Sequence, residues 1–293
     1  MRRRQALFYF PWLEFKRIAL GVKHSAEVDI TDNCNLKCRH CYHFFGRDEF
    51  SKKEESLEVW ENRFRLLFES GVRFILLVGG EPALRIDVLM LAHRIFPFIF
   101  VITNGTKRIP SEFAHRLFVS IDGSREVNDH IRGKGVYDRV LKNYAGDDRV
   151  VINMVLAKEN YTELEHVVRL SVDSGFTGVV CNIYTPRNDG YNPWDLGDGD
   201  RQAIIQELTR VKALYPRDLL VSETMIKWYS VADHRGHCYW GDEALHYGAS
   251  FNPRRCFADN ADCANCGCLA GAAQSPPMMI HQTRELRSIL YEV

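Results

Sequence analysis

Runs of apolar residues rich in β-branched and aromatic side chains recur along the first two thirds of the chain. Six runs have the length and composition of buried strands, at residues 26–31, 74–79, 98–103, 117–122, 150–156 and 178–184. Between most of them, apolar residues recur at the three- and four-residue spacing of an amphipathic helix. This pattern is clearest over residues 56–71 and 163–175, each of which ends on a glycine. The alternation predicts parallel strands joined by right-handed helical crossovers.

The number of predicted strands sets the expected architecture. Because six strands are fewer than the eight that close a full barrel, we expect an α/β fold, an open (β/α)6 partial TIM barrel over residues 24–219. The alternation stops near residue 220, so residues 220–293 are expected to form a small C-terminal cysteine-rich module. Residues 1–23 precede the first strand, and we expect them to cap the open end of the barrel.

Length and charge narrow the class of protein. A chain of 293 residues is long enough for one large domain that buries roughly 75% of its unfolded surface. The 38 basic and 38 acidic residues cancel, so the net charge gives no reason to expect a nucleic-acid partner. No stretch approaches the roughly 18 apolar residues that a membrane-spanning helix needs.

The N-terminal sequence MRRRQALFYFPWLEF resembles a signal peptide. Pro11 and Glu14 interrupt its apolar run, however, and no small-residue cleavage site follows, so we expect a cytoplasmic protein. Basic residues that flank an aromatic, apolar segment could also rest on a membrane surface. Peripheral membrane contact is therefore the alternative to a simple cap over the barrel, and it would favour a lipid-like substrate.

The nine cysteines are an odd number, and they are grouped. One group is Cys34, Cys38 and Cys41, and the other is Cys238, Cys256, Cys263, Cys266 and Cys268. Cys181 stands alone inside a predicted strand, where we expect a buried, inert thiol. Close spacing in a chain without an export signal is typical of metal or iron–sulfur ligands rather than disulfides. We therefore expect a reducing compartment.

Polar and glycine-rich motifs follow each predicted strand. The first strand leads to the cysteine loop, and the others lead to GGEP (79–82), TNGT (103–106), DGS (122–124), KEN (158–160) and TPRND (185–189). Because the carboxyl ends of parallel strands share one rim, all of these motifs should lie together. Three thiolates can hold three irons of a four-iron cube and leave the fourth iron open to a reactant, as three protein ligands do at catalytic zinc.

The motif C-x3-C-x2-C, followed by an aromatic residue and by GGEP at the end of the next strand, resembles the radical S-adenosylmethionine (radical SAM) superfamily over roughly residues 24–190. The resemblance implies that Cys34, Cys38 and Cys41 hold a [4Fe-4S] cluster whose open iron is chelated by the amino and carboxylate groups of SAM. A Cys3His zinc site that includes His40 or His43 is the alternative, but it would leave GGEP unexplained.

The same resemblance implies a set of SAM contacts. Tyr42 would lie near the adenine, and Gly79, Gly80, Glu81 and Pro82 would receive the methionine amino group. Glycine lacks Cβ, which would let backbone carbonyl groups approach the ligand closely. Further contacts to the ribose and carboxylate are expected on the strand ends, from Thr103, Asn104, Ser120, Asp122 and Asn153.

The tail resembles, in part, the auxiliary-cluster domains of the SPASM and twitch type. The likeness lies in GASFNPRRCF, which precedes DCANCGC. Too few cysteines follow for two clusters, so we expect one auxiliary [4Fe-4S] cluster, with structural zinc as the alternative. Five cysteines are available for four ligand positions, and the sequence leaves the choice among them open.

The resemblance implies an enzyme in which a low-potential donor, such as flavodoxin or ferredoxin, reduces the cluster. SAM is then cleaved, and a 5′-deoxyadenosyl radical abstracts hydrogen from a substrate. We expect a lipid, an isoprenoid or another small metabolite, because the tail resembles that of enzymes acting on such molecules and because a peptide-binding module has no room before the first strand. The alternatives are a SPASM-type maturase of a ribosomally made peptide and, in a different class, a non-catalytic metal-binding scaffold.

Overall fold

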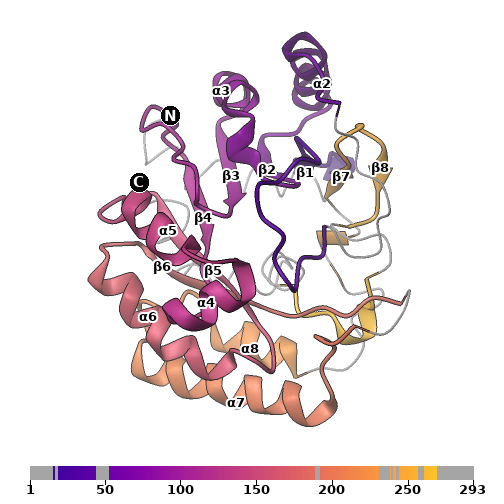
Figure 1. The fold of residues 1–293 in the computed structure, drawn as a ribbon. Coiled ribbons are helices and arrows are strands. Elements are labelled where there is room, and N and C mark those ends of the chain that lie inside the picture. The colour runs from indigo at the N-terminus through magenta and orange to yellow at the C-terminus, as the bar shows by residue number, and fades with distance from the viewer. Residues whose placement is uncertain are drawn as a thin grey trace.

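The computed structural model describes residues 16, 19–43, 53–188, 192–230, 238, 240–241, 244–256 and 261–268 (Figure 1). Most of the segment predicted to cap the barrel, residues 1–23, lies outside the described residues, and so does the sequence that suggested membrane contact. Among the described residues, no helix is both long and apolar enough to cross a membrane.

The described strands form one sheet in the order β6-β5-β4-β3-β2-β1-β7-β8. The strands are β1 (Ser25–Asp29), β2 (Phe74–Val78), β3 (Phe98–Thr103), β4 (Arg116–Ser120), β5 (Val150–Leu156), β6 (Gly178–Ile183), β7 (Leu245–Tyr247) and β8 (Pro253–Arg254). All neighbours pair in parallel except β7 and β8, which are antiparallel. The six predicted strands and the parallel α/β architecture of a partial TIM barrel are therefore confirmed.

Helices cover the outer face of this sheet (Figure 1). They are α2 (Leu57–Glu69), α3 (Ile86–Ile95), α4 (Arg125–Arg132), α5 (Val136–Tyr144), α6 (Leu164–Asp173), α7 (Asp198–Leu214) and α8 (Glu223–Tyr229). In α2, the Ser56 side chain accepts a hydrogen bond from the Val59 amide and so caps the helix. Trp60 and Phe64 then point from one face of α2 into the main hydrophobic core. Both predicted helices are present as α2 and α6.

Helix α7 was not predicted, although its apolar positions follow a helical period. Ile204, Leu208 and Val211 are fully buried and stand four and three residues apart. Polar residues surround them in the sequence, so the segment lacks the strong contrast that marked α2 and α6. The alternation of strands and helices consequently extends past β6 by two helices, α7 and α8.

The face of the sheet turned away from α2 and α3 has an aromatic floor. The rings of Phe74 and Phe100 lie 4.9 Å apart, and those of Phe100 and Phe118 lie 5.0 Å apart. Trp240 packs on Phe74 at 6.3 Å. Toward the carboxyl ends of the strands, this inner face becomes polar, with Ser120 at the end of β4. The inner face is thus apolar at its base and hydrogen-bonding at its rim.

The tail contacts both edges of the six-stranded sheet. At one edge, β7 pairs with β1, matching Ala26 to Leu245 and Val28 to Tyr247. At the other edge, the Ile183 amide donates to the Gly267 carbonyl at 2.9 Å. The boundaries at residues 23 and 219 remain predictions, but β7 continues the sheet of the core across the second of them.

Candidate functional site

The loop after β1 carries three free thiols. Cys34, Cys38 and Cys41 are half-buried and form no disulfide. Burial, together with the nearby Glu81, Cys41 and Cys38, raises the pKa of Cys34 to about 11. Burial also raises the pKa of Cys38, against the lowering effect of Arg132. The Cys41 amide donates to the Cys38 carbonyl at 3.2 Å, so a tight turn separates these two cysteines. Three soft sulfur donors without disulfides are the ligand set that suits an iron–sulfur cluster.

Amide side chains join the start of this loop to the end of β3. Asn104 donates through Nδ2 to the Asn35 side chain at 2.9 Å, and Asn35 donates to Thr106 Oγ1 at 2.8 Å. Asn104 Nδ2 also lies 3.8 Å from the Cys34 sulfur. The predicted contact of Asn104 with SAM stays a prediction, and the structure shows a supporting role for this residue. It holds the backbone that carries Cys34.

The other end of the loop is tied to Asp122, at the end of β4. The Asp122 carboxylate is fully buried and lies 2.7 Å from His40 Nε2 and 2.7 Å from Arg132 Nε, while the Val155 amide donates to it at 3.0 Å. Burial alone would raise the pKa of Asp122, but Arg132 and His40 hold it well below its usual range. Asp122 thus fixes the residue between Cys38 and Cys41, and its predicted contact with SAM stays a prediction.

The two glycines of GGEP make room for the cysteine loop. A Cβ at Gly80 would lie 2.2 Å from the Asn33 carbonyl oxygen, and one at Gly79 would lie 2.4 Å from that of Thr31. The close approach lets the Gly80 amide donate to Thr31 and the Glu81 amide donate to Asn33, each at 2.8 Å. The missing Cβ atoms thus make room for the segment leading to Cys34, and the predicted contact of these glycines with the ligand stays a prediction.

The Glu81 side chain is buried and satisfied by the chain itself. It accepts hydrogen bonds from Thr103 Oγ1 at 2.6 Å, from the Asn104 amide at 2.6 Å and from the Ala83 amide at 2.8 Å. Burial raises the pKa of Glu81, and these hydrogen bonds oppose the increase. Glu81 and Thr103 therefore join the ends of β2 and β3, and Pro82 opens the short 3-10 helix Pro82–Leu84. Contact of this turn with the methionine amino group remains a prediction.

Two other predicted residues lie side by side on the inner rim. Ser120 of β4 pairs in register with Asn153 of β5, and both are nearly buried. Asn182 of β6 donates through Nδ2 to Asn153 Oδ1 at 2.8 Å, which extends the polar row by one strand. We did not predict Asn182, although an asparagine in an otherwise apolar strand, CNIY, was a signal that could have identified it.

Tyr42 lies against a cluster of buried charges on β1 and β8. Burial raises the pKa of Tyr42, and the negative charges of Asp29 and Glu27 raise it further, whereas Arg254 lowers it. The Arg254 guanidinium donates to both oxygens of Asp29 at 2.8 and 2.7 Å and reaches Glu27 at 3.3 Å. Trp240 Nε1 donates to Glu27 at 2.9 Å. The sequence did not predict Glu27, Asp29 and Arg254 as site residues, because no local pattern indicates that residues so far apart in the chain form ion pairs.

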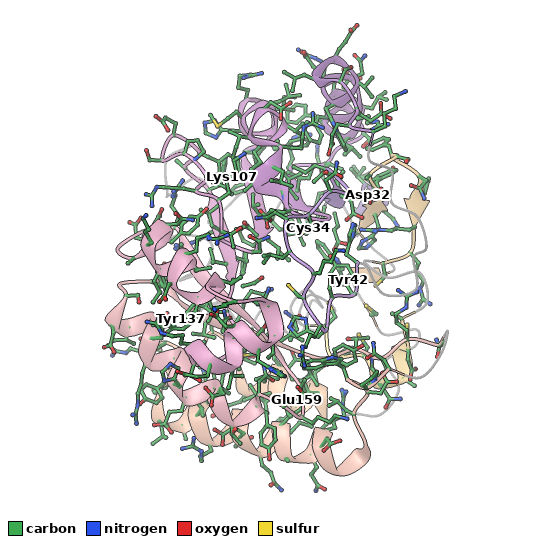
Figure 2. The ribbon with its side chains drawn as sticks, in the orientation of Figure 1. Asp32, Cys34, Tyr42, Lys107, Tyr137 and Glu159 are labelled. Carbon is green, nitrogen blue, oxygen red and sulfur yellow. The ribbon has the colours of Figure 1, made fainter. Side chains whose placement is uncertain are left out.

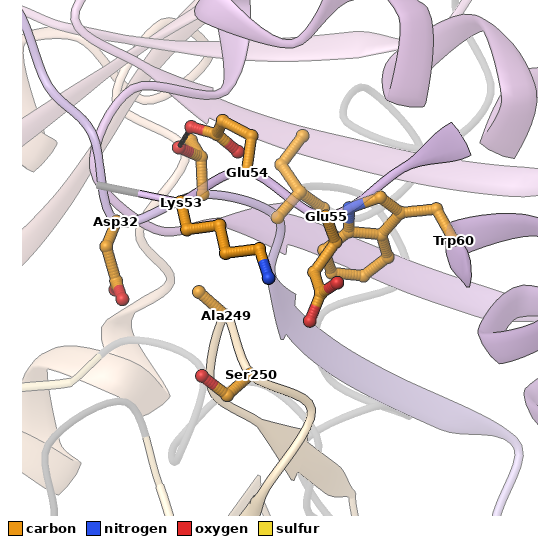
Figure 3. Close-up of a pocket in the computed structure, with 9 residues that line it drawn as sticks. Asp32, Lys53, Glu54, Glu55, Trp60, Ala249 and Ser250 are labelled. Atoms are coloured by element: carbon orange, nitrogen blue, oxygen red, sulfur yellow. Dashed lines mark hydrogen bonds between the residues drawn. The ribbon is translucent and has the colours of Figure 1, made fainter. Parts of the chain in front are cut away.

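A small cavity of about 60 Å³ lies beside the start of the cysteine loop, where Thr31 and Asp32 line it (Figure 3). Glu54 lines it and accepts hydrogen bonds from Thr31 Oγ1 at 2.6 Å and from the Asn33 side chain. Arg85 donates to the second oxygen of Glu54 at 2.7 Å. The cavity is too small for SAM or an organic substrate, so this network supports the loop rather than forming the binding site.

The five tail cysteines are also free of disulfides. Burial raises the pKa of Cys266, and the nearby Cys238 and Cys263 raise it further. The Cys268 amide donates to the Cys266 sulfur at 3.4 Å. The choice of four ligands among the five tail cysteines stays a prediction.

Hydrogen bonds seat the tail cysteines beside the end of β6. The Gly267 amide donates to Thr185 Oγ1 at 2.9 Å, and the hydroxyl of Thr185 lies 3.9 Å from the Cys266 sulfur. Arg201 of α7 donates to the Cys266 carbonyl at 2.9 Å and to the Asn265 carbonyl at 3.0 Å. Cys266 therefore lies at the carboxyl-terminal end of β6, whereas Cys238 packs with Trp240 against the aromatic floor. Figure 2 labels Cys34 and Tyr42 in the loop after β1.

Sequence comparisons identify relatives of the chain. Residues 28–171 match the sequence model of the Radical SAM superfamily. Mycofactocin maturase MftC of Mycolicibacterium smegmatis is 31% identical over 186 residues, which are 57% of this chain and 46% of the relative. Pre-heme d1 synthase of Dinoroseobacter shibae is 32% identical over 182 residues, 54% of this chain and 43% of the relative. The chain thus spans about half the length of these relatives or slightly less.

Solved structures share the fold at lower identity. SuiB of Streptococcus suis bound to S-adenosylmethionine superposes with a TM-score of 0.65 at 14% identity, over 94% of this chain and 72% of SuiB. The enzyme anSMEcpe with bound AdoMet superposes with a TM-score of 0.62 at 15% identity, over 90% of this chain and 84% of that chain. At these low sequence identities, the structural similarity is evidence for a shared fold alone.

Proposed function

We propose that the chain, whose residues 28–171 match the Radical SAM superfamily, is a radical SAM enzyme that cleaves SAM reductively and uses the resulting radical to modify a peptide. The observation that carries the first part is the loop after β1, which bears three half-buried thiols without disulfides. A [4Fe-4S] cluster bound there would supply the electron for reductive cleavage of SAM. Cys34, Cys38 and Cys41 are the residues that would hold it.

The residues around the loop keep it in a single conformation. Asn104 holds the loop near Cys34, and Asp122 holds it between Cys38 and Cys41. Because these anchors are buried and satisfied before any ligand binds, the ligand set is preorganised. Ser120, Asn153 and Asn182 offer a hydroxyl and two amides on the inner rim, and we assign to them the hydrogen bonds to SAM.

A peptide substrate is better supported than the lipid or isoprenoid that the sequence had led us to favour. SuiB was solved bound to the precursor peptide SuiA, and anSMEcpe was solved with the peptides Kp18Cys and Cp18Cys. MftC, a sequence relative, is named a maturase. The relatives also include Fe-coproporphyrin III synthase of Methanosarcina barkeri, so a tetrapyrrole is the second candidate substrate.

The second part of the site is the tail group, to which we assign an auxiliary [4Fe-4S] cluster. In support, the tail thiols form no disulfide, and Cys266 lies beside the end of β6. This position suits a cluster that contacts the substrate side of the barrel or accepts an electron from the product. Structural zinc remains the competing assignment, and metal analysis distinguishes them.

The test is anaerobic reconstitution followed by incubation with SAM and dithionite. We expect 5′-deoxyadenosine from the wild type and none from Cys34→Ala, Cys38→Ala or Cys41→Ala. Folded Cys263→Ala should keep this uncoupled SAM cleavage while losing turnover of the true substrate. A scaffold without catalytic activity would give no deoxyadenosine from any form, and persistence in Cys34→Ala would show that the loop does not hold the cluster.

A further inference from the structure

Arg201, near the start of helix α7, binds the tail segment that carries Cys266. Its guanidinium donates to the carbonyl oxygens of Cys266 at 2.9 Å, of Asn265 at 3.0 Å and of Tyr229 at 3.1 Å. Residue 201 lies close to the amino end of α7, where the helix dipole disfavours a cation. The local helix therefore does not explain an arginine at this position.

The half-buried Arg201 has no carboxylate partner among the described residues, since its hydrogen bonds go to carbonyl groups. The buried Arg132, by contrast, lies 2.7 Å from the Asp122 carboxylate. Burial lowers the pKa of Arg201, and the nearby Cys266 opposes the decrease. Removing a cation from water is costly unless an anion lies close to it.

The described structure around Arg201 leaves no room for a separate anion. The cavity beside it has a volume of about 10 Å³, which is at the lower limit for one water molecule. The Asp262 carboxylate instead accepts hydrogen bonds within its own turn, at 2.9 and 2.7 Å. Burial raises the pKa of Tyr229 well above its usual value, so its hydroxyl stays neutral. The sulfur of Cys266 remains as the source of negative charge.

We propose that Arg201 is a positioning residue for a metal–thiolate group at the tail cysteines. Its hydrogen bonds hold the backbone that carries Cys266, and its positive charge compensates the negative charge of the bound group. This inference rests on the tail assignment of the proposed function. It holds for either metal, because four thiolates exceed the charge of Zn²⁺ or of a [4Fe-4S]²⁺ core by two. An iron–sulfur cluster becomes more negative on reduction, so Arg201 should also raise its reduction potential.

The test separates the charge of Arg201 from its hydrogen bonds. Arg201→Lys keeps the charge and loses the planar fork, whereas Arg201→Gln keeps an amide donor and loses the charge. Arg210→Gln removes a charge from an exposed site on the same helix and is the matched control. All variants are prepared as reconstituted full-length protein, and Cys263→Ala identifies the signals of the tail group by their absence.

Retention of metal is the first readout. Reconstituted protein is incubated anaerobically with EDTA, and the loss of iron and zinc is followed over time. We expect the tail metal to leave Arg201→Gln about tenfold faster than the wild type or more, because the neighbours of metal ligands contribute this much to affinity. Arg201→Lys and the control should release it at nearly the wild-type rate. Equal release from Arg201→Gln and the wild type would overturn the proposal.

The reduction potential of a tail cluster is the second readout, from a redox titration followed by electron paramagnetic resonance. At a fixed potential, the ratio of reduced to oxidised cluster should fall about tenfold in Arg201→Gln, a shift of about 59 mV for one electron. The ratio should stay near the wild-type value in Arg201→Lys. The same shift in both variants would show that geometry rather than charge sets the potential, against the proposal.

Two further outcomes would contradict the proposal. Lower stability to urea of metal-free Arg201→Gln than of metal-free Arg201→Lys would show that the charge serves the fold rather than the metal. Wild-type protein that binds metal only at Cys34, Cys38 and Cys41 would refute the tail assignment and, with it, this inference. That result is distinct from the variant data and leaves the proposed SAM cleavage at the first group standing.

Discussion

At the scale of single residues, the polar groups at the strand ends chiefly bind one another. Glu81 holds Thr103 and the Asn104 amide, Asn104 holds Asn35, and Asp122 holds His40. Buried polar groups of this kind are costly unless each finds a partner, and here the partners come from neighbouring strand ends. Their common effect is to position the loop that carries the thiols.

Asp122→Asn should test this positioning role. The substitution leaves the Arg132 guanidinium buried without its carboxylate, so we expect a loss of about 3 to 5 kcal/mol of stability at neutral pH. Iron uptake should fall as well, because the loop between Cys38 and Cys41 loses its anchor. Urea unfolding of the metal-free protein and iron analysis measure the two effects. Unchanged stability would show that the Asp122 network does not hold the loop.

The stability difference between wild type and Asp122→Asn should depend on pH. The pKa of Asp122 lies below its usual range in the folded protein. Its contribution is therefore fully present above the unfolded value of about 3.9 and is lost as the pH falls through the folded value. Urea midpoints measured from pH 7 downward should show a constant gap that narrows only below about pH 4. A gap that closes already near pH 6 would contradict the assignment.

Gly80→Ala should displace the cysteine loop, because the added Cβ would lie 2.2 Å from the Asn33 carbonyl oxygen. We expect a loss of more than about 1 kcal/mol and poor cluster incorporation, since overpacking against backbone has no flexible neighbour to absorb it. Gly199→Ala, in the first turn of α7 with open space around it, is the matched control. It should be neutral or stabilising by up to about 1 kcal/mol. The absorption of reconstituted protein near 400 nm, roughly where [4Fe-4S] clusters absorb, follows incorporation.

At the scale of elements, the tail strands are part of the wall of the barrel. Strand β7 extends the sheet beyond β1, and β8 delivers Arg254 onto the carboxylates of Asp29 and Glu27. Tyr42, which ends the cysteine motif, lies within the electrostatic reach of the same three residues. The tail therefore supports the first cysteine group as well as bearing the second.

Arg254→Ala should consequently damage the core as well as the tail. Removing the guanidinium leaves Asp29 and Glu27 facing each other in a buried site, and we expect a loss of about 3 to 5 kcal/mol. Arg210→Ala, which breaks exposed ion pairs on α7, should leave stability almost unchanged. Urea unfolding compares the two variants. Similar small losses in both would show that the tail strands are dispensable to the core.

At the scale of the whole molecule, the loop after β1 and the tail segment of Cys266 lie at one end of a single sheet. The first follows β1, and the second is seated on β6 through Gly267 and Thr185. Since β1 and β6 are the outer members of the six-stranded unit, the tail approaches the opening from both sides. An auxiliary cluster held by Cys266, as proposed above, would lie near the end of β6.

Metal analysis should reflect the two groups separately. Wild-type protein should contain about eight irons per chain, and Cys263→Ala about four, if each group holds a cube. Cys181→Ala is the control, because Cys181 is fully buried in β6 and belongs to neither group; it should keep all of the iron. About four irons together with one zinc in the wild type would identify the tail as a zinc site.

The sequence by itself determined the features that depend on neighbours along the chain. Alternating apolar runs and helical periods predicted the six parallel strands because burial on a sheet imposes a local pattern. The spacing of Cys34, Cys38 and Cys41 predicted a ligand set, since consecutive ligands on one loop need no distant partner. Sequence also placed Glu81, Asn104 and Asp122 on one rim, because parallel strands end at the same edge.

Only the tertiary structure decided what those residues contact. Asp29 and Arg254 are 225 residues apart, and no local pattern in the sequence predicts that the Arg254 side chain of β8 binds Asp29 of β1. From the sequence, Gly80 is an ordinary turn glycine. Only the structure shows that the Asn33 carbonyl occupies the space that a Cβ at this position would need. Likewise, Asn182 is an isolated polar residue in the sequence, and it joins the site only through its hydrogen bond to Asn153 on the neighbouring strand. Long-range contacts of this kind arise from packing, whose geometry is set by the whole chain at once.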